Sequence, residues 1–90
     1  MFKTLEELIA IIRQRKDSSA EESYTKKLLK NKKLSIEKAR EEIAELIDAI
    51  EKNSNKVHES ADVLYHLMVL LEANGIKIED VMKELKKRQK

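Results

Sequence analysis

The 90-residue sequence contains no cysteine and no proline, and its single glycine is Gly75. Without cysteine the chain can form neither a disulfide nor a thiolate metal site, which fits a reducing cytoplasm. Since glycine and proline are the residues that most oppose helix formation, their scarcity favours an all-α fold. Aromatic residues make up 3% of the chain, so its core must be aliphatic. No apolar run approaches the ~20 residues that a helix needs to cross a bilayer.

Charged residues make up 40% of the chain, and the two signs are nearly balanced, with a net charge of +2. Basic residues cluster in two stretches that lack interleaved aromatic residues for base stacking: Lys30, Lys32 and Lys33, and Lys86, Lys87, Arg88 and Lys90. Such stretches are typical of a solvated surface. Residues 1–7 begin an acidic amphipathic pattern rather than a signal peptide. We therefore expect a cytoplasmic protein that binds neither nucleic acid nor membranes.

The spacing of apolar residues predicts a helix over residues 4–16 and a short second helix that ends at about Lys30. The first helix has apolar residues at i, i+3, i+4 and i+7: Leu5, Leu8, Ile9 and Ile12. Each helix also begins with a candidate capping pair: Thr4 with Glu7, and Ser19 with Glu22.

A third helix is expected after a polar connection at residues 31–34, with Ser35 as its N-cap. Its apolar residues fall in one stripe: Ile36, Ala39, Ile43, Leu46, Ile47 and Ile50. The run Asn53-Ser54-Asn55 ends this helix, and Ser54 or Asn55 can cap the next.

The fourth helix is expected to continue to about Asn74, with Gly75 as the residue that ends it. From Ala61 to Leu71 it is apolar around nearly its whole circumference, which predicts a central helix. A last amphipathic helix has four apolar positions: Ile78, Val81, Met82 and Leu85. We therefore expect one domain over residues 1–90, with four to five helices. A chain this short buries only a modest core, so a partner subunit would help.

Two pairs of carboxylates are the best candidates for chemistry: Glu42 with Glu45, and Glu59 with Asp62. Each pair is spaced i, i+3, which brings the two side chains close on a helix. Oxygen ligands of this kind suit hard cations such as Mg²⁺. On the third helix alone the acids also fit a solvated face, and on the fourth they fit ordinary first-turn acids that complement the helix dipole. His66 lies nearby, although a lone histidine on a helix is usually a packed imidazole.

The acidic pattern resembles the metal-binding motif of the MazG-like all-α nucleoside triphosphate pyrophosphohydrolases. It reads Glu41-Glu42-x-x-Glu45, then 13 residues, then Glu59-x-x-Asp62. Four flanking segments are similar to one family within that group, phosphoribosyl-ATP pyrophosphohydrolase: Ser23–Leu28, Lys38–Glu42, Glu59–Leu67 and residues 75–85. The chain departs from the family pattern at Glu22 and Arg40, which stand where the family usually has glycine.

The resemblance implies a helical bundle completed by dimerisation, and hydrolysis of phosphoribosyl-ATP to phosphoribosyl-AMP and pyrophosphate in the second step of histidine biosynthesis. It implies Mg²⁺ bound by four carboxylates: Glu42, Glu45, Glu59 and Asp62. The expected catalytic residues are Glu41, Glu42 and Glu45. Candidate substrate contacts are Tyr24, Lys26, Lys38, Arg13 and His66. The cyclohydrolase domain often fused to this family is absent from the sequence, so we expect a separate protein to catalyse the next step.

Two other functions are compatible with the same residues. The acidic motif is shared with housekeeping pyrophosphatases that act on canonical or damaged nucleotides. The chain could also be a noncatalytic helical interaction module whose acids are only surface charge. Pyrophosphate release and the effect of removing single carboxylates discriminate among the three.

Overall fold

The computed structural model describes residues 1–17 and 23–89, in which every regular element is an α-helix. The five helices are α1 (Lys3–Asp17), α2 (Tyr24–Lys30), α3 (Lys32–Lys52), α4 (Lys56–Ala73) and α5 (Ile78–Arg88). The predicted all-α fold of four to five helices is therefore confirmed. Within the described residues, no helix has the length and apolar character required to span a membrane.

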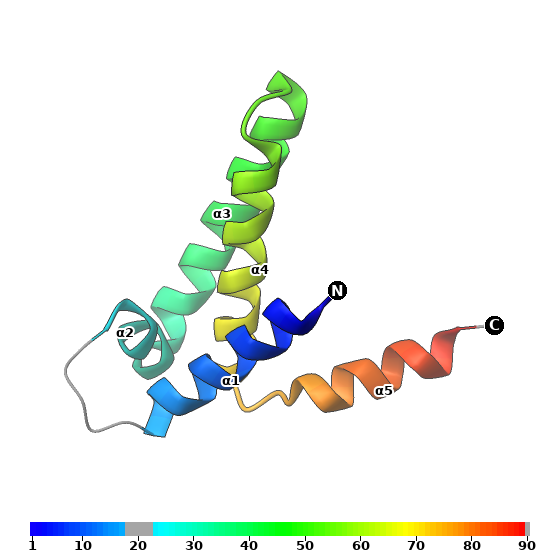
Figure 1. The fold of residues 1–90 in the computed structure, drawn as a ribbon. Coiled ribbons are helices and arrows are strands. Elements are labelled where there is room, and N and C mark those ends of the chain that lie inside the picture. The colour runs from blue at the N-terminus through cyan, green and yellow to red at the C-terminus, as the bar shows by residue number, and fades with distance from the viewer. Residues whose placement is uncertain (18–22, 90) are drawn as a thin grey trace.

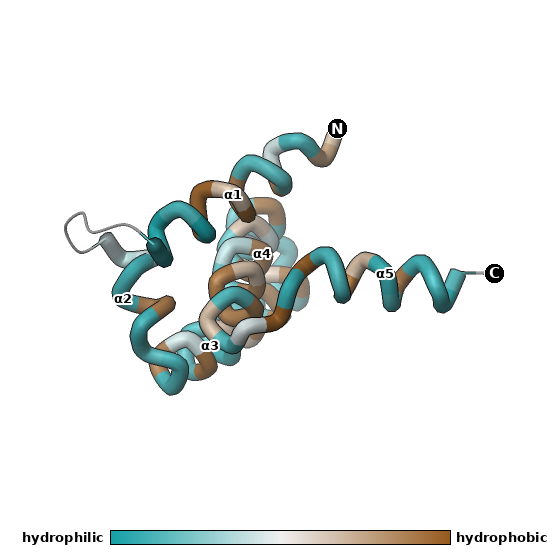
Figure 2. The backbone as a smooth tube through the Cα atoms, turned by 90° about the horizontal axis from the view of Figure 1, so that it is seen from below, coloured by the Kyte–Doolittle hydropathy of each residue, from teal (hydrophilic) through white to brown (hydrophobic). Residues whose placement is uncertain are grey.

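The long helices α3 and α4 form an antiparallel hairpin, and α1 and α2 pack near the end of this hairpin that lies away from its loop (Figure 1). Figure 2 looks toward that end and shows α5 projecting away from the other helices. Helix α4 contacts all four of the other helices. It is the central helix, as its apolar sequence predicted.

The core lies where α1, α2 and α4 meet, and it is aliphatic. Four side chains form its buried centre: Ile12, Leu28, Met68 and Val69. Partly buried apolar residues from all five helices pack around this centre, among them Leu8 of α1, Tyr65 of α4 and Ile78 of α5. Because α4 supplies two of the four central residues, the position of its acidic N-terminal half is set by this core.

The residues that α3 buries fully are small, and the isoleucines of its apolar stripe are not among them. Its buried positions are Ser35, Ala39 and Ala49, and small side chains allow two helix backbones to approach closely. Four isoleucines of the stripe are instead 41–56% exposed: Ile36, Ile43, Ile47 and Ile50. The isoleucines of the predicted stripe therefore face away from the core of this chain, whereas its Ala39 is buried and its Leu46 is half-buried.

The cap predicted at Ser35 is wrong, because α3 begins directly after α2. The single residue Asn31 ends α2, and its side chain accepts a hydrogen bond from the backbone N–H of Leu34. Ser35 lies inside α3 and donates its hydroxyl to the carbonyl oxygen of Leu28. Helix α2 is capped by Ser23, whose Oγ accepts from the Lys26 N–H. The predicted Ser19–Glu22 pair lies outside the described residues.

The hairpin loop depends on two asparagines in the left-handed region, Asn53 at φ 55° and Asn55 at φ 53°. Asparagine tolerates this region better than most residues. Asn55 is the N-cap residue of α4, one of the two predicted positions, although its side chain makes no capping hydrogen bond. Gly75, at φ 69°, follows α4 as predicted. The tight reversal at residues 53–55 places the first turns of α4 beside the last turns of α3.

Candidate active site

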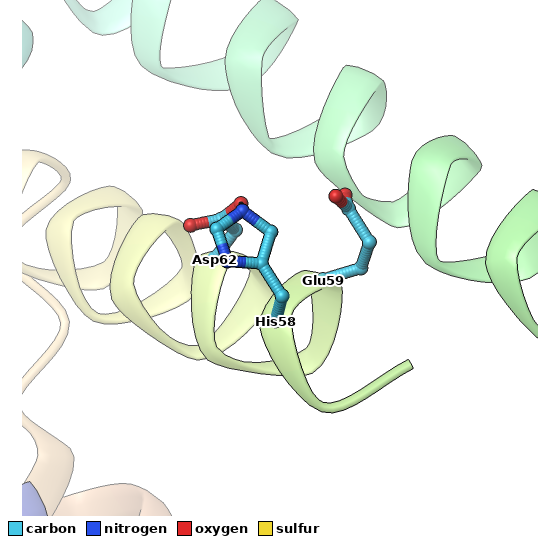
Figure 3. A group of neighbouring side chains, drawn as sticks. All are labelled: His58, Glu59 and Asp62. Carbon is cyan, nitrogen blue, oxygen red and sulfur yellow. The ribbon is translucent and has the colours of Figure 1, made fainter. Parts of the chain in front are cut away.

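The carboxylates of α3 and α4 meet across the hairpin. One oxygen each from Glu42, Glu45 and Glu59 lies within 4.8 Å of the others. In a second group, one ligand atom each from Glu59, Asp62 and His58 also lies within 4.8 Å of the others. Because Glu59 belongs to both groups, the two acidic pairs found in the sequence form one acidic cluster. Figure 3 shows the Glu59 side chain extending toward α3, while the His58 ring lies beside Asp62.

The electrostatics of this cluster are unfavourable without a cation. Hydrogen bonding to Glu45, burial and repulsion from neighbouring carboxylates raise the pKa of Glu42 to about 7. Burial, followed by repulsion from Glu45 and Asp62, raises the pKa of Glu59. The Oε2 atoms of Glu42 and Glu59 are buried and have no hydrogen-bond partner. Unpaired oxygens of this kind require a proton, a donor or a metal ion.

The donor set fits a hard divalent cation. Carboxylate oxygens from two helices converge, and Mg²⁺ is usually held by a few carboxylates together with water and phosphate oxygens. His58 adds one nitrogen, with Nε2 at 3.4 Å from Asp62 Oδ2 and its side chain 72% exposed. The sequence reasoning missed His58. Its i, i+4 spacing from Asp62 is the signal that could have identified it.

An open groove of about 440 Å³ lies next to the acidic cluster. Its lining comes from the last turns of α3, the hairpin loop and the start of α4: Glu41, Ala44, Glu45, Asp48, Ala49, Ser54, Asn55 and Glu59. Four of these residues are acidic, so the groove repels a phosphate group unless cations screen the charge. An anionic ligand would therefore need a cation to enter this groove.

Three of the candidate substrate contacts lie beside the cluster. His66 Nδ1 is 3.9 Å from Glu42 Oε1, and the Tyr24 hydroxyl is 3.0 Å from His66 Nε2. Burial raises the pKa of Tyr24, although the residue as a whole remains 49% exposed. Lys38 Nζ lies 3.5 Å from Glu41 Oε2 at the edge of the groove. Helices α2, α3 and α4 therefore all contribute side chains to one region.

Arg13 lies elsewhere. Its guanidinium donates two hydrogen bonds to Glu79 and one to Glu72, and it ties α1 to α4 and α5. Glu72 is ten residues after Asp62 on α4, roughly 15 Å along the helix axis. The structure does not bring Arg13 to the acidic cluster.

The remaining candidate substrate contact, Lys26, is on α2 near Tyr24. Of the two positions at which the chain departs from the family pattern, Arg40 is exposed on α3 and Glu22 lies outside the described residues.

Residues 5–89 match the sequence model of phosphoribosyl-ATP pyrophosphohydrolase. The chain belongs to this family. The relatives include histidine biosynthesis bifunctional protein HisIE of Pyrococcus furiosus, 46% identical over 87 residues that cover 96% of this chain and 41% of that protein. Phosphoribosyl-ATP pyrophosphatase of Haloarcula marismortui is 41% identical over 90 residues, covering 94% of this chain and 92% of that protein. The corresponding enzyme of Allorhizobium ampelinum is 43% identical, with 94% and 85% covered.

The chain spans less than half the length of the bifunctional relatives from Pyrococcus furiosus and Thermotoga maritima, and most of the length of the single-function ones. A phosphoribosyl-ATP pyrophosphohydrolase, like other pyrophosphohydrolases, generally needs a divalent metal ion. Within the described residues, the acidic cluster at the α3–α4 hairpin is where suitable ligands converge.

Proposed function

We propose that this protein hydrolyses the α–β phosphoanhydride of phosphoribosyl-ATP, the second step of histidine biosynthesis. Water adds to phosphorus, the anhydride P–O bond breaks, and phosphoribosyl-AMP and pyrophosphate are released. The observation that carries the proposal is the convergence of carboxylates from α3 and α4, with two buried oxygens left unpaired. Family membership supports the choice of substrate.

In this proposal Glu42, Glu45, Glu59 and Asp62 hold Mg²⁺. The ion supplies a Lewis acid that neutralises phosphate charge and makes a water more acidic. The chain's contribution is to fix four carboxylates on two packed helices, so that little rearrangement is needed on binding. The raised pKa values of Glu42 and Glu59 support this assignment. Hydrogen bonding to Glu45 and burial raise the first pKa, burial raises the second, and repulsion from neighbouring carboxylates adds to both; a bound cation would offset the burial and the repulsion.

Glu41 and Glu45 line the open groove and can orient the attacking water and accept its proton. Lys38, at the same edge, supplies positive charge to a phosphate oxygen, and Lys26 is a second candidate. The exposed face of the Tyr24 ring can contact the nucleotide. Arg13 is left out of this proposal because Glu72 and Glu79 already bind its guanidinium.

The test is pyrophosphate release from phosphoribosyl-ATP by the purified chain, with Mg²⁺ and with EDTA. Glu42→Gln and Asp62→Asn each remove one ligand charge with little change in shape. Because even partners one shell beyond a metal ligand typically contribute 10–100-fold, we expect each variant to lose about 100-fold or more in turnover. Glu37→Gln, at an exposed position of α3, is the matched control and should keep wild-type activity.

Two results would redirect the assignment. Faster turnover of a canonical or damaged deoxynucleoside triphosphate than of phosphoribosyl-ATP would identify a housekeeping pyrophosphatase. Wild-type turnover in both carboxylate variants, with helicity retained, would remove the acidic cluster from the chemistry and favour a noncatalytic interaction module.

The same proposal includes a homodimer. The isoleucine stripe of α3 is exposed, and so are Leu64 and Leu67 of α4 and Met82 and Leu85 of α5. Apolar faces of this kind on three helices of a short chain indicate a protein contact, and a second copy is the occupant that the family resemblance implies.

The cytoplasmic location expected from the cysteine-free sequence stays a prediction.

A further inference from the structure

His66 is a buried histidine whose two ring nitrogens both have partners inside the protein. The residue is 7% exposed. Its Nδ1 lies 2.9 Å from the carbonyl oxygen of Asp62, and its Nε2 lies 3.0 Å from the hydroxyl of Tyr24. A carbonyl oxygen can only accept, so Nδ1 carries the hydrogen. In the neutral ring Nε2 then holds a lone pair, and Tyr24 donates to it.

This pattern fixes which edge of the ring faces the acidic cluster. The same Nδ1 is 3.9 Å from Glu42 Oε1, beyond hydrogen-bond length but within range of a charge–dipole attraction. The Glu42 side chain is only 17% exposed, so protein neighbours rather than solvent set its orientation. Because the backbone that accepts from His66 belongs to Asp62, the ring contacts one carboxylate residue on each helix of the hairpin.

Helix α2 holds the ring in this orientation. Tyr24 is the first residue of α2, and Ser23 caps that helix. The Tyr24 ring stacks on Tyr65 at 6.4 Å between centroids and meets the His66 ring edge-on at 5.9 Å. Tyr65 also meets His66 edge-on, at 5.0 Å. The imidazole therefore cannot rotate freely, and its Nε2 depends on the Tyr24 hydroxyl for a hydrogen-bond donor.

We propose that Tyr24 and His66 form a positioning pair, in which the Asp62 carbonyl sets the Nδ1–H form of His66, the Tyr24 hydroxyl holds the ring by donating to Nε2, and the Nδ1 edge of the ring in turn orients Glu42 to bind the divalent ion. This inference rests on the proposed metal site. It gives His66 a role different from substrate contact, since neither ring nitrogen is available to a ligand. Tyr24 links α2 to the metal ligands without binding the metal itself.

The decisive comparison is between Tyr24→Phe and Tyr65→Phe. Both variants keep an aromatic ring and both remove one hydroxyl hydrogen bond between α2 and α4, since the Tyr65 hydroxyl bonds to Thr25. Only Tyr24→Phe leaves His66 Nε2 without its donor. With Mn²⁺ alone as probe, and free ion measured by electron paramagnetic resonance, we expect Tyr24→Phe to weaken binding about tenfold. Tyr65→Phe should leave the dissociation constant within about twofold of wild type.

A second comparison separates the hydrogen-bond donor from the space that the ring fills. His66→Asn places an amide N–H near the position of Nδ1, while His66→Leu has almost the same shape and no donor. We expect His66→Asn to bind Mn²⁺ more tightly than His66→Leu by about tenfold. In metal-free protein, ¹⁵N chemical shifts of the imidazole should report the Nδ1–H form in both wild type and Tyr24→Phe, with the Nε2 resonance shifted in Tyr24→Phe because its hydrogen-bond donor is lost.

Equal Mn²⁺ affinities for Tyr24→Phe and Tyr65→Phe would overturn the inference, as would equal affinities for His66→Asn and His66→Leu. Either result would make the contacts merely structural. These outcomes are separate from failure of the proposed function, which would show as absent pyrophosphate release by wild-type protein that binds Mn²⁺ normally. Circular dichroism checks that each variant keeps its helices, and Tyr24→Phe, which loses only one oxygen, decides the matter if a His66 variant fails to fold.

Discussion

Glu42 illustrates how one side chain can oppose folding and serve binding. Its carboxyl group is mostly buried, one oxygen has no partner, and three other carboxylates lie close by. In the metal-free protein this arrangement costs free energy because the charged form is poorly solvated and repelled. With a divalent ion bound, the same closely spaced carboxylates would serve as ligands that are already in position. Function and stability therefore make opposite demands at this residue.

The stability of the metal-free protein should consequently fall as pH rises through the titration of Glu42. Folding raises its pKa from about 4.3 to about 7, so between those values the folded state binds more protons than the unfolded state. We expect Glu42→Gln to be more stable than wild type at pH 8 in EDTA, by on the order of 1 kcal/mol after allowance for residual solvation. The difference should vanish near pH 4. Thermal unfolding at both pH values measures it.

Added Mg²⁺ should reverse that order at pH 8. An ion that binds only the folded protein stabilises it, so wild type should gain thermal stability with Mg²⁺ concentration, and Glu42→Gln should gain little. A Glu42→Gln protein that is no more stable than wild type at pH 8 in EDTA would contradict the electrostatic account.

Helix α5 is connected to the other helices by one cluster of ion pairs near its N-terminus. The guanidinium of Arg13 lies 2.6 Å from Glu79, and hydrogen bonding to Arg13 lowers the pKa of Glu79 to about 2. No residue of α5 is buried, although Ile78 packs against the core. With so little apolar burial, the attachment of α5 depends strongly on this pair.

The attachment of α5 should therefore weaken in acid. A depressed pKa stabilises the fold above the unfolded pKa of about 4.3, and this contribution is lost as pH falls toward 2. We expect Glu79→Gln to speed hydrogen exchange of α5 amides at pH 7, with no added effect near pH 2. Glu84→Gln is the matched control, because Glu84 pairs with Arg88 inside α5. Equal exchange in the two variants would show that Arg13 does not anchor the helix.

Local signals in the sequence predicted more of the helices than of their contacts. The i, i+3 spacing of the acids and the run at residues 53–55 were sufficient to predict two acidic helix segments, and the structure brings these together. The Ser35 cap failed because local hydrogen-bonding preference did not distinguish it from Asn31, four residues earlier. The partners of Arg13 lie 59 and 66 residues away, and no local pattern indicates such contacts.

The direction of the isoleucine stripe also depends on the assembled molecule. Periodicity shows that α3 has an apolar face, but in the folded chain α3 buries small residues fully and leaves the isoleucines of that face exposed. Ile47 and Ile50 are each more than half exposed. Exposed isoleucines at this spacing have a cost in water that burial against a second copy would remove.

Dimer formation should therefore be lost when a charge is placed in that stripe. We expect wild type to scatter light as a particle of twice the 10.5 kDa chain mass at micromolar concentration, and Ile47→Lys to scatter as a monomer. Because Ile47 is 54% exposed in the isolated chain, the substitution should leave the helical content of the monomer unchanged. Glu37→Lys adds the same side chain at an exposed polar position of α3 and should stay dimeric. A wild-type monomer at these concentrations, or a dimeric Ile47→Lys, would mean that the stripe has another occupant.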